Sequence, residues 1–182
     1  MRVLDIFCYN MIMLIEFSKL DNLPVFELET QTRVGQFADF FIDEDEYIVE
    51  AAIVSAGGLI KKQKFVSAKE ISELSKEALI VDQADSLVEP KEMVRFQKKL
   101  KKRAKIIGEK VYTKKGEYLG NVYDYVLENT TLSIVRIYLK KMFDQRIIHS
   151  SAIVKIEQHK ITVKDNFEMV KPEVLPAHAK LA

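Results

Sequence analysis

The stretch LGNVYDY at residues 119–125 decides the fold prediction, because an earlier stretch, VGQFADF at residues 34–40, matches it without a gap. Each stretch is apolar and aromatic, as strands are. Each also places a glycine and an aspartate at the same two positions: Gly35 and Asp39, then Gly120 and Asp124. A glycine inside a strand weakens packing and often marks a bulge or a tight bend. We expect the aspartates to cap neighbouring donors rather than to act as ligand or general base, since the same residue recurs in both copies.

A second match lies downstream of the first. KFVSAKEI at residues 64–71 corresponds to RIIHSSAI at residues 146–153, with a slip of three residues in the intervening turn. Short segments rich in Val, Ile, Phe and Tyr predict a mainly β protein with strands at 14–17, 25–28, 34–42, 47–54, 64–66, 79–81, 110–112, 119–127, 133–138, 146–148 and 160–163. The internal repeat therefore predicts two small copies rather than one large domain.

The segment between the copies, residues 90–105, has the periodicity of a helix. Apolar residues recur three and four positions apart, at Met93, Phe96, Leu100, Ala104 and Ile107. Pro90 suits a first helical position, and the basic residues near the end of the segment complement the helix dipole. We predict a short amphipathic helix with its apolar face packed on one copy and its basic face outward.

These patterns divide the chain into five parts. They are an N-terminal extension with a first strand (1–17), a first copy (18–84), a helical linker (85–106), a second copy (107–166) and a C-terminal tail (167–182). Whether residues 1–10 are ordered stays open.

The second copy begins with GEKVYTKKGEYLGNVYD at residues 108–124, which is a strand, a turn at Gly116 and a Leu-Gly-x-Val-x-Asp strand. With residues 146–153, this pattern resembles the PRC-barrel family of small β-barrels. The first copy departs from it, with one extra residue and no glycine at the turn, and Val34 before its strand glycine. The resemblance covers about residues 18–166. It implies a mainly β fold of two small PRC-like β-barrels in tandem, joined by a short basic amphipathic helix.

The family resemblance implies two functional contexts. Family members include the cytoplasmic domain of the photosynthetic reaction-centre H subunit, linked to electron transfer, and the C-terminal domain of the ribosome-maturation factor. Neither context transfers cleanly, because the chain has no evident membrane anchor and its first half resembles another PRC barrel.

The near-neutral charge of the chain hides two unlike halves. The 182 residues hold 28 basic and 27 acidic side chains, yet residues 1–90 have a net charge of −9 and residues 91–182 a net charge of +10. Such asymmetry suggests a polyelectrolyte partner, or an acidic part docked on a basic one.

The basic excess is greatest at residues 91–115, where the candidate partner-binding or nucleic-acid-binding residues are Lys98, Lys99, Lys101, Lys102, Arg103 and Lys105. Three interpretations stay open: a contact with nucleic acid such as RNA, a solvated helix face, and a face docked on the acidic copy. An anionic membrane ranks lower.

Groups that could perform catalysis are sparse. The chain has three histidines, His149, His159 and His178, and a single cysteine, Cys8, with no spacing typical of a metal site. His149 lies next to serines, but neighbours in a strand point to opposite faces. The acidic residues 43–46 are expected to form a solvated hairpin tip rather than a calcium loop. We therefore expect no enzyme activity, no catalytic residue, no metal and no cofactor.

The N-terminal residues 1–17 are apolar, but Asp5, Asn10 and Glu16 interrupt them, so they fail as a membrane span. With one unpaired thiol, a cytoplasmic protein is expected. The function predicted is a non-catalytic adaptor or scaffold for a protein or RNA–protein partner, in RNA processing or ribosome assembly. The alternative is a module that binds a small molecule or is associated with electron transfer. The sequence leaves self-association open.

Overall fold

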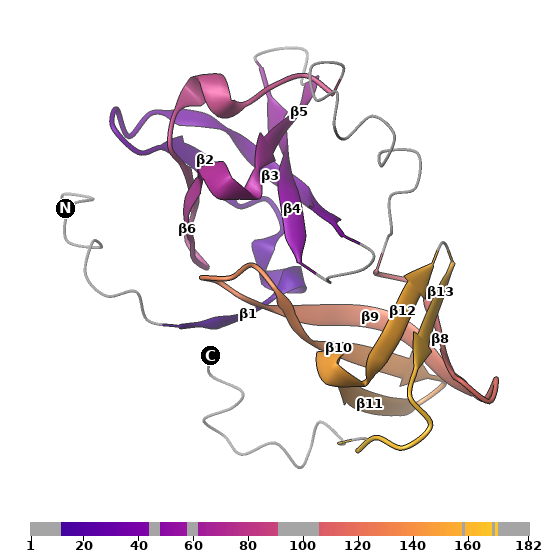
Figure 1. Cartoon of the computed structure of the whole chain (residues 1–182). Helices are drawn as coiled ribbons and strands as arrows, with labels where there is room; N and C mark the ends of the chain where they lie inside the picture. Colours follow the sequence, from indigo (N-terminus) through magenta and orange to yellow (C-terminus); the bar gives the residue numbers. More distant parts are fainter. Residues whose placement is uncertain are drawn as a thin grey trace.

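The computed structural model describes residues 12–43, 48–57, 62–90, 106–157, 159–168 and 170. The described chain is mainly β and forms two sheets, one from each half of the sequence (Figure 1). The strands of the first half are β1 (Leu14–Glu16), β2 (Pro24–Glu27), β3 (Arg33–Ile42), β4 (Val49–Ala56), β5 (Lys62–Ser67), β6 (Ile71–Leu74) and β7 (Leu79–Val81). Those of the second half are β8 (Lys110–Thr113), β9 (Tyr118–Glu128), β10 (Ile134–Lys141), β11 (Asp144–His149), β12 (Ile153–Glu157) and β13 (Lys160–Val163).

The two sheets have the same strand order. The first runs β5-β4-β3-β2-β7-β6 and the second β11-β10-β9-β8-β13-β12. In both sheets the first strand of the repeat pairs in parallel with the last, β2 with β7 and β8 with β13, and the other pairs on these two paths are antiparallel. The other described strands lie where the sequence predicts them, whereas β6 and β12 were not predicted.

The slip of three residues in the sequence repeat has a structural explanation. Ala56 pairs with Lys62 across the β4–β5 hairpin, which leaves five residues in the loop. Lys141 pairs with Asp144 across the equivalent β10–β11 hairpin, which leaves only Met142 and Phe143. The hairpin loop is thus three residues shorter in the second half, and the matched segments on either side keep their register.

The sequence also predicted two small barrels and a linker helix. The described strand pairings do not close either sheet into a barrel, because the end strands β5 and β6, and β11 and β12, are not paired with each other. Short 3₁₀ turns, η3 (Ala68–Glu70) and η5 (Ser150–Ala152), connect these end strands. The predicted linker helix lies in residues 91–105, outside the described residues. Of its apolar stripe only Ile107 is described, and it is 39% exposed, whereas its neighbour Ile106 is buried.

The first strand of the chain does not join the first sheet. β1 pairs with β9 of the second sheet, with Ile15 opposite Leu127 (Figure 1). The chain then forms a 3₁₀ turn, η2 (Phe17–Leu20), and enters the first sheet at β2. A strand from the N-terminal segment is therefore hydrogen-bonded to the half of the molecule that is furthest from it in sequence.

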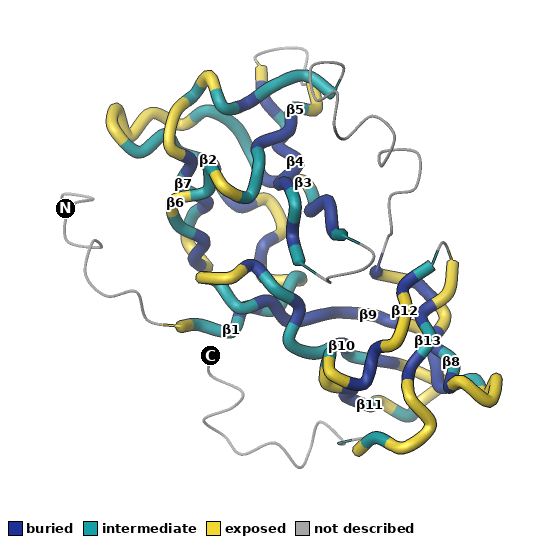
Figure 2. Tube along the Cα trace, viewed as in Figure 1, coloured by how far each residue is buried: buried dark blue, intermediate teal, exposed yellow. Residues whose placement is uncertain are grey.

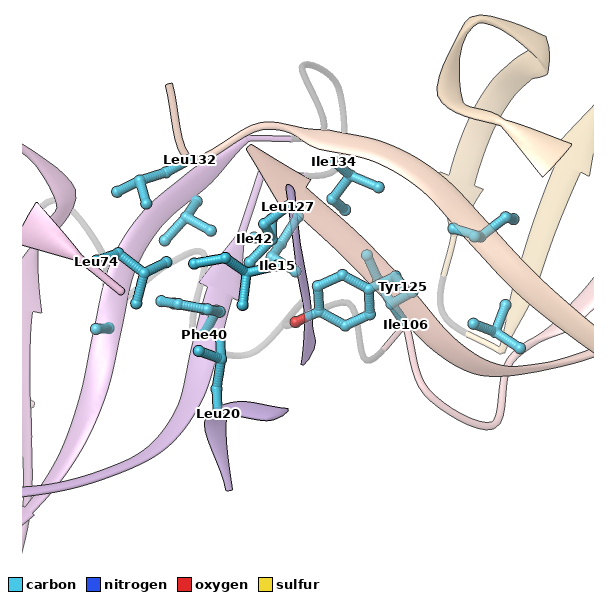
Figure 3. Close-up of a cluster of buried hydrophobic side chains, with 14 of the residues drawn as sticks. Ile15, Leu20, Phe40, Ile42, Leu74, Ile106, Tyr125, Leu127, Leu132 and Ile134 are labelled. Atoms are coloured by element: carbon cyan, nitrogen blue, oxygen red, sulfur yellow. The ribbon is translucent and has the colours of Figure 1, made fainter. Parts of the chain in front are cut away.

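Both halves contribute to one hydrophobic core. Side chains from β1, β3, β4 and β6 pack in the same cluster as those from β9 and β10, and Figure 3 shows Phe40, Leu74, Tyr125 and Leu127 within it. Figure 2 shows that β9 is buried along most of its length. A smaller second cluster, Phe41, Ala51, Ile53 and Phe65, belongs to the first sheet alone. The halves are thus joined by a shared core, in addition to the chain that links them.

Candidate functional site

The repeated glycines lie where one strand passes close to the next. The pairing of β2 with β3 shifts register beside Gly35, and the pairing of β8 with β9 shifts beside Gly120, so each glycine adjoins a β-bulge. A Cβ atom at Gly35 would lie 2.5 Å from Val54 Cγ1, and one at Gly120 would lie 2.8 Å from the Lys140 carbonyl oxygen. These contacts explain why both strands have glycine at the bulge. Gly116 has a φ of +88° in the β8–β9 turn, where Gln31 adopts a φ of +54° in the equivalent turn of the first half.

Replacing Gly120 with Ala should lower the free energy of unfolding by about 2 kcal/mol. The residue has a φ of +140°, which L side chains rarely adopt, and the added Cβ would meet the β10 backbone. Gly116→Ala is the matched control, since it also has a positive φ but nothing lies within 4 Å of its Cβ position. It should cost about 1 kcal/mol. Urea denaturation measures both, and equal losses would contradict a steric role for Gly120.

The repeated aspartates follow a second bulge in the same strands. The β3–β4 pairing skips Ala38, and the β9–β10 pairing skips Tyr123. Asp39 and Asp124 come directly after these residues, and each Oδ1 accepts the N–H of the next residue, at 2.8 Å from Phe40 N and 2.9 Å from Tyr125 N. The carboxylates therefore occupy the same local position in both halves, each receiving a backbone donor where the ladder changes register.

Asp124 also joins the two halves. Its Oδ1 accepts the Ser18 N–H at 3.1 Å, and its Oδ2 accepts the Ser18 hydroxyl at 2.6 Å. Asp124 is 5% exposed, and Ser18 lies in η2, the turn that leads from β1 into the first sheet. Three donors thus surround this buried carboxylate, and two of them come from the other end of the chain.

An aromatic cluster packs next to this joint. The ring of Phe17 stacks on that of Tyr125 at 4.7 Å between centroids, with 17° between the planes. The centroid of the Phe17 ring also lies 6.2 Å from that of Phe37 and 6.4 Å from that of Phe40. Phe37 and Phe40 belong to β3 and Tyr125 to β9, so Phe17 links the aromatic residues of both sheets.

Two histidines lie within the described residues, and both have local structural partners. His149 Nδ1 accepts the Ser151 N–H at 3.2 Å and lies 3.0 Å from Ser151 Oγ, which caps the η5 turn. Ser67 accepts the Lys69 N–H at the equivalent place in the first half. His159 lies in the β12–β13 turn, 3.8 Å from Glu109. His178 and Cys8 lie outside the described residues.

A groove opens between the two halves. It has a volume of about 910 Å³ and lies between the β4, η3 and β6 segments and the β9–β10 turn, lined by Ile48, Val49, Glu50, residues 67–69, residues 71–74 and residues 129–132. Two backbone contacts join the halves beside the groove: Val49 N donates to Leu132 O at 2.9 Å, and Ile48 pairs with Ser133. Apolar and polar residues both line it.

The basic residues singled out from the sequence, 98–105, lie outside the described residues, as do three of the acidic residues 43–46. The structure instead shows a row of exposed polar residues that crosses five strands of the second sheet. Adjacent partners in the row are Lys160 with Lys110, Lys110 with Asn121, Asn121 with Lys140 and Lys140 with Gln145. Cross-strand partners share a face of the sheet, so these side chains lie together on its solvent side.

Four tyrosines lie along this row. The rings of Tyr112 and Tyr118 are 5.4 Å apart, and those of Tyr123 and Tyr138 are 5.9 Å apart. The Tyr118 hydroxyl donates to Asn121 Oδ1 at 2.6 Å, which connects the first pair to the row. Lys160 Nζ lies 5.5 Å from the Tyr112 ring centroid, and Lys141 Nζ lies 5.4 Å from that of Tyr118. We call this surface the tyrosine–lysine face: Lys110, Tyr112, Tyr118, Asn121, Tyr123, Tyr138, Lys140, Lys141, Gln145 and Lys160.

The end of the tyrosine–lysine face nearest β1 is partly enclosed. Burial raises the pKa of the Tyr138 hydroxyl, and its hydrogen bond to Glu16 adds to the increase, while Arg136 opposes it. Burial also raises the pKa of Tyr123, together with the charges of Asp124 and Glu16.

Sequence reasoning missed this face because its members come from five strands. The basic run at 91–115 contains Lys110 and Tyr112, but its other aromatic partners lie outside that run. One available signal was that no tyrosine occurs between residues 48 and 111, whereas five occur between residues 112 and 138. Only the pairing of β8, β9, β10 and β13 places four of those five on one side.

Further observations limit the chemistry of the described part of the chain. In that part no three His, Cys, Asp or Glu side chains come together as a metal site requires. No helix within the described ranges is long and apolar enough to cross a membrane.

No curated protein is similar to the chain at a significant level. Residues 99–170 match the family model described as the PRC-barrel domain, and they include β8 to β13. The second half of the chain is therefore similar to a PRC-barrel domain, which is consistent with a protein of that family.

Proposed function

We propose that this protein is a non-catalytic adaptor that binds a protein or RNA–protein partner, in RNA processing or ribosome assembly. The observation that carries the proposal is the position of Asp124. The carboxylate of the family-like motif is 5% exposed and receives donors from Ser18 and Tyr125, so it fastens the halves together rather than facing a substrate. PRC-barrel domains are generally non-catalytic and often mediate protein interactions. We expect the adaptor to act in the cytoplasm, where its lone cysteine stays reduced.

We further infer that the first half is a divergent copy of the same domain. Its strand order and parallel β2–β7 pair match those of the second half. The isolated bridges match as well, since Phe65 pairs with Val88 and Ile147 with Val170, which are the same number of residues apart. The divergence then lies in the surface, which is acidic in one copy and basic in the other.

The opposite charges of two fused copies support a binding role. A single partner contacting both copies would meet an acidic surface and a basic one in fixed relative positions, because a shared core holds them. Electrostatic complementarity of this kind favours selection of one partner over another. Binding through the basic residues would weaken as salt concentration rises.

Reversing the charge of the basic linker tests the adaptor function. A chain with Lys98, Lys99, Lys101, Lys102 and Arg103 all changed to Glu should lose a salt-sensitive complex that the natural chain captures from its source cell. Capture with and without nuclease distinguishes a protein partner from an RNA-dependent one. The control reverses charge on the first half instead, with Lys62→Glu and Lys76→Glu, both at exposed lysines. Identical capture by the natural and linker-reversed chains would remove the linker from the proposal.

The groove between the halves favours a second candidate, a module that binds a small molecule. Its volume of about 910 Å³ lies within the range of ligand pockets. The expected result is a ligand that survives purification and adds to the chain mass in native mass spectrometry. A spectrum with only the mass of the bare chain would count against this candidate.

A further inference from the structure

We propose that the tyrosine–lysine face of the second sheet binds single-stranded RNA by stacking bases on its tyrosine rings and pairing phosphates with its lysines. The inference rests on the proposed function in that it names RNA as the direct ligand of one surface. It differs in location, because the site is the sheet rather than the linker.

The face combines the two groups that single-stranded nucleic acid requires. Aromatic rings on a sheet surface can stack bases of any identity, and lysines along them can follow the phosphate backbone. Tyr112 and Tyr118 form one ring pair and Tyr123 and Tyr138 another, with Asn121 and Lys140 between them in the strand register. Five strands about 4.8 Å apart give the row a length of about 19 Å. That length suits a few successive nucleotides.

The lysines that cover the rings can exchange their contacts. Lys160 and Lys141 each place an ammonium group over a tyrosine ring, within the distance of a cation–π interaction. Both side chains are exposed and attached by flexible stems. A base that stacks on the ring can displace the ammonium group, which then lies next to the phosphate of the same nucleotide. The ammonium groups that cover the two rings can therefore bind the phosphates of the ligand.

The first half provides an internal comparison. In the second half Lys110, Asn121 and Lys140 are cross-strand neighbours in the row. The equivalent neighbours in the first half are Pro24, Gln36 and Ser55. Ile53 pairs with Asp39 as Tyr138 pairs with Asp124, and Ile53 is 1% exposed within a buried apolar cluster. Two sheets with one strand order therefore differ on this face. The fold does not require tyrosines and lysines here, so their presence in the second half points to a ligand.

The acidic groups near the face include the buried Asp124, which lies opposite Tyr138 in the strand register, and Glu157, which lies opposite Lys160 at the end of the row. These groups have cationic partners or hydrogen bonds. Glu157 pairs with Lys155 at 2.8 Å, and Asp144 pairs with Arg146 at 2.7 Å. Glu16 is hydrogen-bonded to Tyr138. The centre of the row, from Lys160 to Lys140, has three positive charges and no negative one.

The chemistry of the face favours RNA over duplex DNA and over DNA strands. A sheet surface with upright rings needs unpaired bases, which a duplex does not offer. Tyrosine hydroxyls and the side-chain amides of Asn121 and Gln145 lie among the rings, where they can bond the ribose 2′-hydroxyl that distinguishes RNA. We therefore expect a DNA strand to bind more weakly than an RNA strand of the same base sequence.

Fluorescence anisotropy of the purified full chain with a labelled, unstructured twelve-nucleotide RNA tests the inference. The double variant Tyr112→Ala/Tyr118→Ala should bind at least about tenfold more weakly, because each stacked base contributes a measurable part of the affinity. Tyr112→Phe/Tyr118→Phe keeps the rings and should retain binding to within about threefold. Lys140→Gln/Lys160→Gln should lower the slope of log affinity against log salt by about 1.4, since each phosphate contact on a single strand contributes about 0.7.

The controls keep the result interpretable. Lys62→Gln/Lys76→Gln makes the same charge change on the first half and should leave affinity and slope unchanged. Thermal midpoints of all variants show whether the fold is intact, and the lysine variant still tests the face if the alanine variant unfolds. RNA binding that is unchanged in the alanine and lysine variants would overturn the inference. Equal affinity for the DNA strand would overturn the assignment to RNA.

Failure of this inference can be told from failure of the adaptor function. If the linker-reversed chain loses RNA while the face variants keep it, the linker is the RNA site and the inference is wrong. If the face variants lose a captured protein but the natural chain does not bind RNA, the face is a protein-binding surface and the inference is again wrong. If the natural chain binds RNA through the face but captures no complex, the inference holds and the adaptor function fails.

Discussion

Tyr125→Ala is expected to lower the free energy of unfolding by about 4 kcal/mol, which is the largest effect we expect from a single side chain. Tyr125 is 2% exposed and one of the largest buried side chains in the described chain. Its ring stacks on Phe17 and lies in the cluster that both sheets share (Figure 3). Its truncation would leave a cavity at the joint of the two halves, and the packing of both sheets would suffer. Urea denaturation followed by circular dichroism measures the loss.

Tyr123→Ala is the matched control for this prediction. Tyr123 lies two residues earlier in β9 but is 40% exposed at a bulge. Its truncation leaves no enclosed cavity, so a loss below about 1 kcal/mol is expected. A Tyr125→Ala chain that is no less stable than the Tyr123→Ala chain would contradict the shared core. If Tyr125→Ala does not fold, Tyr125→Leu should still show a smaller loss of the same sign.

Asp124→Ala should lower the free energy of unfolding by about 3 kcal/mol. The change leaves the buried Tyr125 N–H and the partly buried Ser18 N–H and hydroxyl without their acceptor. Hydrogen bonds to a charged group contribute more than neutral ones, and unpaired buried donors add a further penalty. Chemical denaturation of Asp124→Ala and of the milder Asp124→Asn measures the effect.

A double-mutant cycle with Ser18→Ala assigns part of this loss to the joint between the halves. Ser18 and Asp124 are in contact, so the two single losses should exceed the double loss by about 1 kcal/mol. Thr30→Ala is a control for loss of a hydroxyl, because Thr30 bonds Glu27 within an exposed turn and should not couple to Asp124. Additive losses for Ser18 and Asp124 would show that the carboxylate does not hold the halves together.

The repeat and the strands follow from short-range pattern. Alternating Val, Ile, Phe and Tyr between turn residues predicts the strands, and the paired matches at 34–40 and 119–125 predict that both halves share one strand plan. The slip of three residues was also readable, because the β10–β11 hairpin has a loop of two residues where β4–β5 has five. The strand glycines predicted a bulge or tight bend, and the aspartates predicted capping of neighbouring donors. The register shifts beside Gly35 and Gly120 and the backbone N–H groups bound by Asp39 and Asp124 agree with both.

The relation between the halves did not follow from the sequence. Nothing in residues 14–16 indicates that they pair with residues 126–128, because the strand pattern alone does not specify a partner. Nor does the sequence near Asp124 indicate that Ser18 donates to it, since the contact joins residues 106 apart. The sequence suggested two copies joined by a helix, whereas the described structure joins them through β1, η2 and a common core.

By itself, then, the sequence determined the β architecture, the internal repeat, the resemblance of the second half to a PRC-barrel domain and the opposite charges of the two halves. Each of these depends on residues close together in the chain or on simple counts. The tertiary structure alone decided which strand edge receives β1, that Asp124 is a joint, and that four tyrosines and a row of lysines share one face. Those features depend on sheet register, which brings distant residues side by side through hydrogen bonds that no local pattern specifies.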